Sequence, residues 1–141
     1  MGFSAFSAGL IISEVCDHAD TYNARYVEIY NATDSTIDLT NYVLNVYVND
    51  NVTVGGTFDF TGTIASGEAK VVTQDATEFN NEFGLTADWD WTFNNGNGDD
   101  TFELVNNGTP IDIYGEIGTD GTGEAWEYLD SVATRAASVG D

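Results

Sequence analysis

The sequence contains very few basic residues. Arg25, Lys70 and Arg135 are the only Lys and Arg, against 24 Asp and Glu, which gives a formal net charge of −21 at pH 7. Nucleic-acid binding depends on clusters of Lys and Arg that neutralise phosphates, and attraction to an anionic membrane has the same requirement. The composition therefore argues against direct binding to nucleic acid or to anionic lipid. It is typical of a solvated acidic surface in a saline or cation-rich setting, where ions screen the self-repulsion.

Other residue types are scarce too. Cys16 is the single cysteine, so the chain forms no internal disulfide, and we expect a small buried residue at this position. No apolar run reaches the roughly 18 residues that a membrane span needs. Proline occurs once and glycine 15 times, and 13% of the residues are aromatic. This balance predicts β-strands joined by Gly, Asn and Asp turns, in a chain whose 141 residues suit one domain.

The first residues, MGFSAFSAGLII, lack the basic start of a signal peptide, although FSAFSAG is similar to the small-residue end of one. We interpret residues 1–9 as a disordered segment, left either by a signal peptide or by an expression start. Residues 10–141 are interpreted as a single domain. Because the segment is a hint of export, we predict an extracellular or cell-surface location.

Alternating apolar and polar residues predict the strands. In RYVEIYN, Val27 and Ile29 face one way and the polar residues the other, as in a half-buried strand. Comparable patterns predict strands at 10–15, 42–48, 57–62 and 69–73. Turn signals recur about every ten residues, a spacing typical of an antiparallel sandwich.

A hairpin is predicted near the centre of the second half. DDTFELV and IDIYG flank NNGTP, which places Asn107 and Gly108 at the tip. In the second strand, Asp112 lies between Ile111 and Ile113. Since side chains alternate along a strand, we expect Asp112 to face outward and both isoleucines to be buried.

Two segments have helical spacing. Phe79 and Phe83 are four residues apart, which predicts a short helical turn in ATEFNNEFG. In the tail, three-residue spacing suggests a helical face formed by Trp126, Leu129 and Val132. The following SVATRAA is also compatible with a closing strand, and we favour a loop followed by a strand.

Three segments together resemble the lamin tail domain: YVEIYNATDSTIDLTNYVL, TGTIASGEAKVVT and NGNGDDTFELVNNGTPIDIYG. The order and spacing of their short motifs extend over roughly residues 10–118, with Tyr42 where lamins have a tryptophan. The resemblance implies an all-β fold, an immunoglobulin-like antiparallel β-sandwich, with no catalytic centre of its own. In bacteria, such domains resemble accessory modules that are attached to extracellular nucleases, phosphatases or other surface proteins.

Catalytic patterns are weak. His18 lies close to Cys16 and to Asp17 and Asp20, but a zinc site needs about four ligands, usually several Cys or His. We interpret CDHAD as a polar loop after a strand. Paired carboxylates are abundant in so acidic a chain, and the sequence contains no P-loop, nucleophile elbow or dinucleotide fingerprint. We predict that the chain is not an enzyme and requires no cofactor.

Calcium is the ligand that the loop NGNGDD invites. An EF-hand register starting at Asn95 fails, because Asp100 stands where Gly is needed and Asn106 where Glu is needed. The β-roll nonapeptide fits better but occurs once, and its sites need stacked repeats. Calcium binding therefore requires oxygens from several loops. The candidate ligands are Asn97, Asp99, Asp100 and Asp120. The alternative is a structural turn, in which Gly96 and Gly98 take unusual dihedral angles and an aspartate caps backbone amides.

Trp89 and Trp91, in DWDW, are candidates for a carbohydrate-stacking surface, and core packing is the alternative.

Together with the resemblance to the lamin tail domain, the composition and motifs predict a non-catalytic interaction module of a secreted or cell-surface bacterial protein, whose partner is another protein or an attached catalytic domain. One alternative is a calcium- or carbohydrate-binding module on the same fold. Another is the non-catalytic part of a secreted nuclease or phosphatase.

Overall fold

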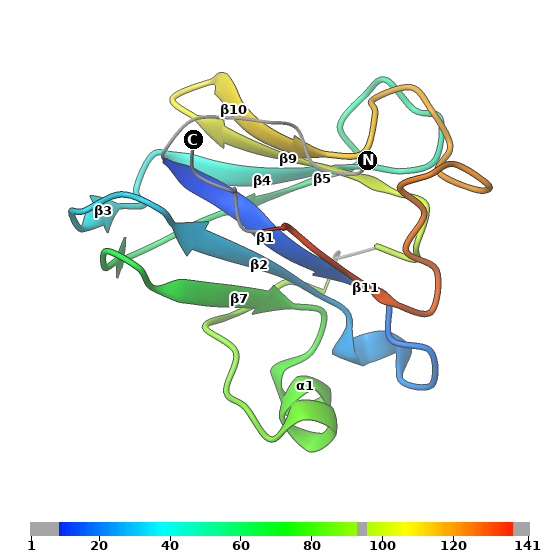
Figure 1. Cartoon of the computed structure of the whole chain (residues 1–141), viewed down its shortest axis with the longest axis horizontal. Coiled ribbons are helices and arrows are strands. Elements are labelled where there is room, and N and C mark those ends of the chain that lie inside the picture. The colour runs from blue at the N-terminus through cyan, green and yellow to red at the C-terminus, as the bar shows by residue number, and fades with distance from the viewer. Residues whose placement is uncertain (1–8, 93–95, 137–141) are drawn as a thin grey trace.

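The computed structural model describes residues 9–92 and 96–136. Two sheets face each other (Figure 1). The first contains five strands, in spatial order β11 (Val132–Thr134), β1 (Leu10–Cys16), β2 (Tyr26–Asn31), β7 (Ala69–Thr73) and β8 (Trp89–Asp90). The second contains four, in the order β10 (Thr109–Tyr114), β9 (Thr101–Asn106), β4 (Tyr42–Tyr47) and β5 (Gly56–Asp59). A short pair consists of β3 (Ile37–Asp38) and β6 (Thr63–Ile64).

The pairing is antiparallel throughout the described strands except between β7 and β8. The predicted antiparallel β-sandwich is therefore confirmed. Of the segment 1–9 that we expected to be disordered, residues 1–8 lie outside the described part of the chain.

The core lies between the two sheets and follows the predicted alternation. Val27 and Ile29 of β2 are fully buried, as expected from RYVEIYN. The second sheet contributes Leu44 and Leu104, also without exposed surface. Each buried side chain of this size stabilises the fold by roughly 1.5–3 kcal/mol relative to exposure, so the alternating strands supply the main driving force.

The predicted hairpin joins β9 to β10. Asn107 and Gly108 at its tip have φ angles of 49° and 76°. Both values lie in the left-handed region that two-residue hairpin turns of type I′ require, which explains the Asn-Gly pair. The predicted tip is confirmed.

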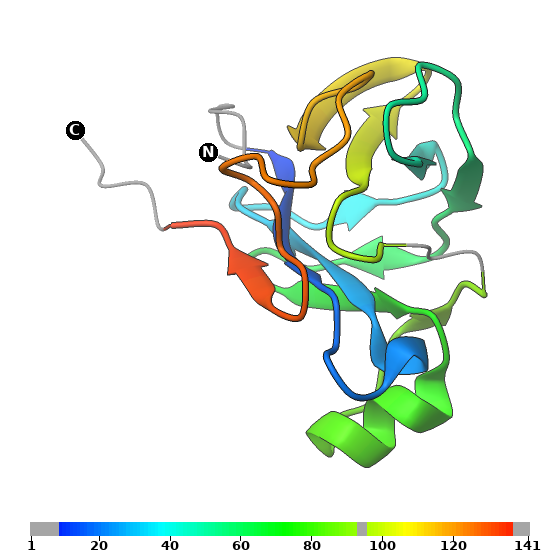
Figure 2. The same cartoon turned by 90° about the vertical axis from the view of Figure 1, so that its right-hand side faces the viewer.

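The helical turn expected near Phe79 is a complete helix, α1 (Ala76–Phe83). Asp75 caps its N-terminus with a carboxylate that accepts hydrogen bonds from two backbone amides, and Gly84, with a φ of 66°, caps its C-terminus. The rings of Phe79 and Phe83 lie 5.4 and 5.5 Å from that of Tyr26. Tyr26 belongs to β2, so α1 packs beside the five-stranded sheet, away from the four-stranded one (Figure 2).

The tail forms a loop followed by a strand, as we favoured. β11 pairs antiparallel with β1 through three residue pairs. The alternative of a helical face formed by Trp126, Leu129 and Val132 is wrong, because Trp126 is buried while Leu129 and Val132 are exposed.

No helix among the described residues is long and apolar enough to cross a membrane.

The prediction for Asp112 is also wrong. The register of the β9–β10 pair shifts between Pro110 and Asp112. A bulge of this kind reverses which side chains face inward, and Asp112 is consequently 1% exposed while Ile111 and Ile113 are half-buried. The buried carboxylate lies on the sheet opposite β1.

Asp112 joins the two sheets and the tail. One of its oxygens, Oδ2, accepts a hydrogen bond from the Ile12 amide at 2.7 Å and faces Nη2 of Arg135 at 2.5 Å. The same arginine donates through Nε to the Ile12 carbonyl at 2.9 Å. Burial raises the pKa of Asp112, although the Ile12 amide and Arg135 oppose the rise. The contact therefore ties β10, β1 and the end of β11 together.

The substitution Asp112→Ala should destabilise the protein by about 3 kcal/mol, since it removes the carboxylate that faces a half-buried arginine and a buried amide. Urea unfolding at pH 7 measures the loss. Asp59→Ala removes an equal charge from an exposed position of β5 and serves as the control, with a small change expected. Equal stability of the two variants would contradict the role of Asp112.

Candidate functional site

Three loops meet near the start of β9, and backbone hydrogen bonds hold them together. The amide of Gly121 donates to the Asp99 carbonyl at 3.0 Å, and the amide of Tyr128 donates to the Gly98 carbonyl at 2.8 Å. The amide of Asp17, after β1, donates to the Ser131 carbonyl at 3.0 Å. The turn at 96–100 is therefore joined to the loop that precedes β11.

Glycine allows this close approach. A Cβ atom on Gly98 would lie 2.4 Å from the Cα of Leu129, and Gly98 has a φ of 103°. A Cβ atom on Gly121 would lie 2.8 Å from the Cα of Asp99. Both distances are too short for any side chain. The unusual dihedral angle predicted for Gly98 is confirmed. The prediction for Gly96 is not, because Gly96 has no positive φ; a Cβ atom there would instead lie 2.8 Å from the Phe102 ring and from the Tyr128 hydroxyl.

Asp100 connects the turn to the loop after β4. Its Oδ1 accepts a hydrogen bond from the Asn49 amide at 2.9 Å, and Asn49 has a φ of 53°. The side chain has no exposed surface. Burial raises the pKa of Asp100 to about 6, although the amides of Asn49 and Asn97 favour the charged form. The predicted capping role is confirmed, with a capped amide that belongs to a distant loop.

Asp99 faces the loop at 118–124. Its Oδ2 accepts a hydrogen bond from Thr122 Oγ1 at 3.2 Å. Burial raises the pKa of Asp99, the Thr122 hydroxyl opposes the rise, and the nearby charge of Asp120 adds to it. The Thr122 amide donates to Asp120 Oδ1 at 2.9 Å. Asn49 Nδ2 is 3.4 Å from Asp120 Oδ2.

The structure thus brings the four predicted ligands into one neighbourhood. Asn97, Asp99 and Asp100 share a turn, while Asp120 is linked to it through Asn49 and Thr122. The sequence marks the loops that contain these two linking residues, NDN at 49–51 and GTDGTGE at 118–124, as oxygen-rich, but it does not indicate the roles of Asn49 and Thr122 themselves. Across residues 9–92 and 96–136, however, no three His, Cys, Asp or Glu side chains are grouped closely enough to hold a metal ion. Calcium binding remains a prediction.

Several oxygens of this neighbourhood are buried and accept or donate no hydrogen bond. Three of them belong to the predicted ligands: Asn97 Oδ1, Asp99 Oδ1 and Asp100 Oδ2. The hydroxyl oxygens of Thr101 and Tyr128 are also buried and have no hydrogen-bond partner. Buried polar groups in folded proteins are nearly always paired with protein, water or ions, so this concentration marks the turn as unusual.

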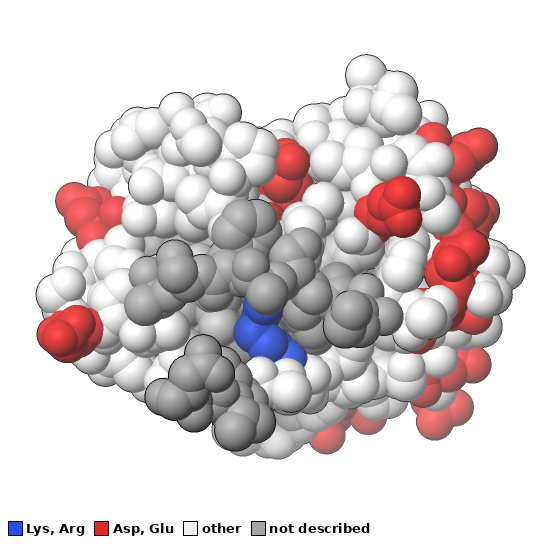
Figure 3. Space-filling model, turned by 45° about the horizontal axis from the view of Figure 1, so that its top comes forward, with Lys and Arg blue, Asp and Glu red and all other residues white. Residues whose placement is uncertain are grey.

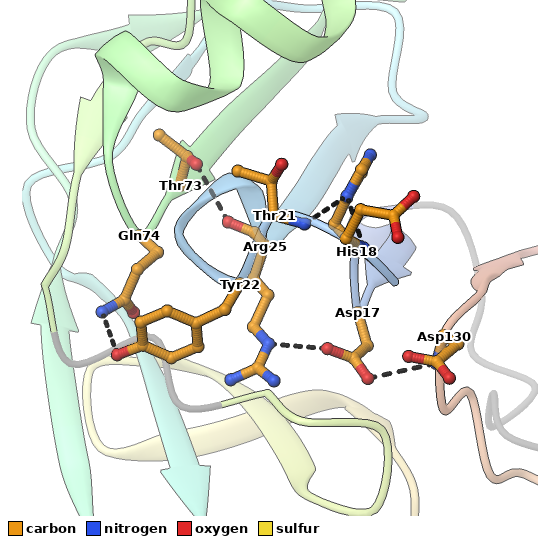
Figure 4. A network of polar contacts seen from close by, with 9 residues as sticks. Asp17, His18, Thr21, Tyr22, Arg25, Thr73, Gln74 and Asp130 are labelled. Atoms are coloured by element: carbon orange, nitrogen blue, oxygen red, sulfur yellow. Dashed lines mark hydrogen bonds and ion pairs between the residues drawn. The ribbon is translucent and has the colours of Figure 1, made fainter.

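A second polar network lies beside the first (Figure 4). Asp17 Oδ1 accepts a hydrogen bond from Arg25 Nε at 2.6 Å, and Asp17 Oδ2 accepts one from the Asp130 amide at 3.1 Å. The Arg25 guanidinium lies 4.6 Å from the centre of the Tyr22 ring. Asp17 is 3% exposed. The interpretation of CDHAD as a polar loop does not anticipate this structural role of Asp17, because Arg25 lies eight residues away in the sequence.

Cys16 and His18 show no arrangement for nucleophilic catalysis. Cys16 is buried in β1, as predicted, and burial raises the pKa of its thiol to about 12. A thiol in this state is a poor nucleophile, because the thiolate is the reactive form. His18 Nδ1 accepts a hydrogen bond from the Thr21 amide at 3.0 Å, and its Nε2 is 3.5 Å from Glu82. The interpretation of CDHAD as a polar loop agrees with these contacts.

Trp89 and Trp91 lie at the edge of the sandwich between β8 and β5. The Trp89 ring is 5.1 Å from the ring of Phe60, and the Trp91 ring is 5.9 Å from that of Phe58. Both tryptophans are partly buried and pack against the core. Lys70 Nζ lies 5.6 Å from the centre of the Trp89 ring. These contacts favour packing, and carbohydrate binding through the two rings remains a prediction.

Asp100 should make stability depend on pH in a defined direction. Its pKa is raised to about 6 from the ordinary value of 3.8, so ionisation costs the folded state more than the unfolded one. This cost is absent below the lower value, and it grows as pH rises and is complete above the higher one. The difference corresponds to about 3 kcal/mol.

The comparison of Asp100→Asn with the original chain isolates this effect, because the other carboxylates titrate in both. Between pH 4 and pH 7, in EDTA, the original chain should lose about 2.4 kcal/mol relative to the variant, because part of the cost is already present at pH 4. Urea unfolding across this range gives the difference. A difference that does not change with pH would contradict the raised pKa.

Comparison with known proteins agrees with this architecture. The family model described as Lamin Tail Domain matches residues 4–118, which include β1 to β10. None of the curated proteins matches the chain. The family is immunoglobulin-like in fold and generally non-enzymatic, as the resemblance implied. Since the match covers most of the sequence, the chain belongs to the lamin tail domain family.

Proposed function

We propose that this lamin tail domain is a non-catalytic interaction module of a secreted or cell-surface bacterial protein, and that it binds a basic surface on another protein or on an attached catalytic domain. The observation that carries the proposal is the use of the three cations. Arg25 contacts Asp17, Arg135 contacts Asp112, and Lys70 Nζ lies 3.7 Å from Asp88. All three basic side chains thus face carboxylates of the same chain.

Acids therefore dominate the charged side chains of the exterior. In the view of Figure 3, acidic side chains gather along one side of the molecule, while basic atoms emerge at one place. A net charge of −21 attracts basic partners over long distances and repels acidic ones. This favours association with a basic protein surface, at a rate that falls as salt is added.

The buried and perturbed acids support a structural role. Glu28, whose pKa is raised by burial, accepts a hydrogen bond from Ser13 Oγ at 2.6 Å. Asp112 holds the two sheets together, and Asp100 holds the loop after β4. A hydrolase would use two carboxylates with separated pKa values on one substrate cleft. The contacts of these acids instead connect strands and loops.

The purified chain should show no hydrolysis above buffer on double-stranded DNA or on p-nitrophenyl phosphate, with Mg²⁺, Mn²⁺ or Ca²⁺ present. The expectation follows from the structural contacts of the acids. Activity that co-purifies with the chain and disappears in Asp99→Asn or Asp100→Asn would contradict the non-catalytic role. Activity that both variants retain at full rate would indicate a contaminant.

Carbodiimide cross-linking, which joins carboxylates to lysines, tests the interaction directly. Lys70 is the only lysine of the chain, so links within it are nearly confined to that residue, and Lys70→Arg removes them. In the protein expressed from its native gene, we expect links from acids of this domain to lysines of a partner or neighbouring domain, and their loss in 1 M NaCl. Their absence at low salt would contradict the proposal.

A further inference from the structure

We propose that the turn at 97–100 binds one calcium ion through Asn97 Oδ1, Asp99 Oδ1 and Asp100 Oδ2. This site is separate from the interaction role proposed above, and neither depends on the other. It differs from the set predicted from sequence by leaving out Asp120 as a direct ligand.

The three oxygens share a chemical property that calls for a cation. An amide oxygen and ionised carboxylate oxygens accept hydrogen bonds and donate none. Each of the three is buried and lacks a hydrogen-bond partner, and Asp100 as a whole has no exposed surface. Leaving such a group unsatisfied destabilises the folded state, and does so more strongly when the group is charged. None of the three can donate to another, so each needs a donor from elsewhere, such as a hydroxyl or a water, or a positive ion.

Each carboxylate is also held in place by its other oxygen. Asp99 Oδ2 accepts from the Thr122 hydroxyl, and Asp100 Oδ1 accepts from the Asn49 amide. The backbone amide of Asn97, at the other end of the turn, also favours the charged form of Asp100. One oxygen of each carboxylate is thus anchored, and the second remains available. Such outer contacts orient the ligands of metal sites.

Calcium suits this donor set better than other metals. It takes carboxylate, amide and carbonyl oxygens in flexible geometry and completes six to eight ligands with water, whereas Mg²⁺ demands a near-ideal octahedron. Two carboxylates balance its charge, so a third acidic ligand is unnecessary. Asp120 already accepts hydrogen bonds from Thr122 and Asn49 and raises the pKa of Asp99 from a distance. The negative charge of Asp120 therefore adds to the electrostatic attraction for a cation at the site.

The test compares thermal melts of the EDTA-treated chain in CaCl₂ and in NaCl of matched ionic strength, with isothermal titration of CaCl₂. We expect one ion per chain and a melting temperature several degrees higher in CaCl₂. Asp99→Asn should weaken binding at least tenfold, since it replaces a charged ligand. Asp34→Asn, at an exposed loop position, changes the net charge equally and should leave binding unchanged.

Terbium luminescence locates the ion independently. A Cβ atom placed on Gly121 would contact both the Trp126 ring, at 2.6 Å, and the Asp99 Cα, at 2.8 Å, so Trp126 lies close enough to sensitise Tb³⁺ in the turn. Trp126→Phe should reduce the sensitised signal while calcium binding persists. Equal melts in the two salts would show that ordered water alone satisfies the oxygens. Equal losses in Asp99→Asn and Asp34→Asn would show charge screening. Either result would overturn the calcium site and leave the interaction proposal standing.

Discussion

The structure depends on the burial of a few carboxylates in a chain that has almost no cations to neutralise them. Asp112 is the clearest case, because a single carboxylate oxygen, Oδ2, contacts both the Ile12 amide and Arg135. These residues belong to β10, β1 and the segment after β11, so a single carboxylate joins both sheets and the tail. The family match ends at residue 118, and Arg135 shows how the segment beyond it becomes part of the sandwich.

Asp100, in the turn before β9, is a buried carboxylate with different surroundings from those of Asp112. Asp100 is as buried as Asp112, but its charge is met by backbone amides rather than by an adjacent arginine. Burial is the main cause of the raised pKa of Asp100, as it is for Asp112. Asp17, by contrast, has Arg25 beside it. The carboxylates of Asp17 and Asp100 therefore hold the loops at this end of the sandwich. Asp100 has no arginine beside it, and it lies in the turn whose oxygens lack hydrogen-bond partners. Structural and binding roles are compatible here, because they use different oxygens of the same side chains.

Local patterns predicted the elements whose side chains follow a regular period. The alternation in β2, the Asn-Gly tip and the Phe79–Phe83 spacing needed no knowledge of distant residues. Asp112 could not be predicted in this way, since a bulge beside Pro110 changed the side-chain period and Arg135 lies 23 residues away. For the candidate site, composition indicated which loops were oxygen-rich. It could not show that Asn49 and Thr122 would hold Asp100 and Asp99, because those hydrogen bonds depend on how separate loops pack.

The central claim is that the turn at 97–100 presents anchored carboxylates whose remaining oxygens are reserved for a cation. A crystal structure grown in CaCl₂, with anomalous difference density, tests this most directly. The account predicts one anomalous peak within about 2.3–2.6 Å of Asn97 Oδ1, Asp99 Oδ1 and Asp100 Oδ2. Density without anomalous signal at hydrogen-bonding distances, about 2.7–3.2 Å from these oxygens, would identify water and contradict it.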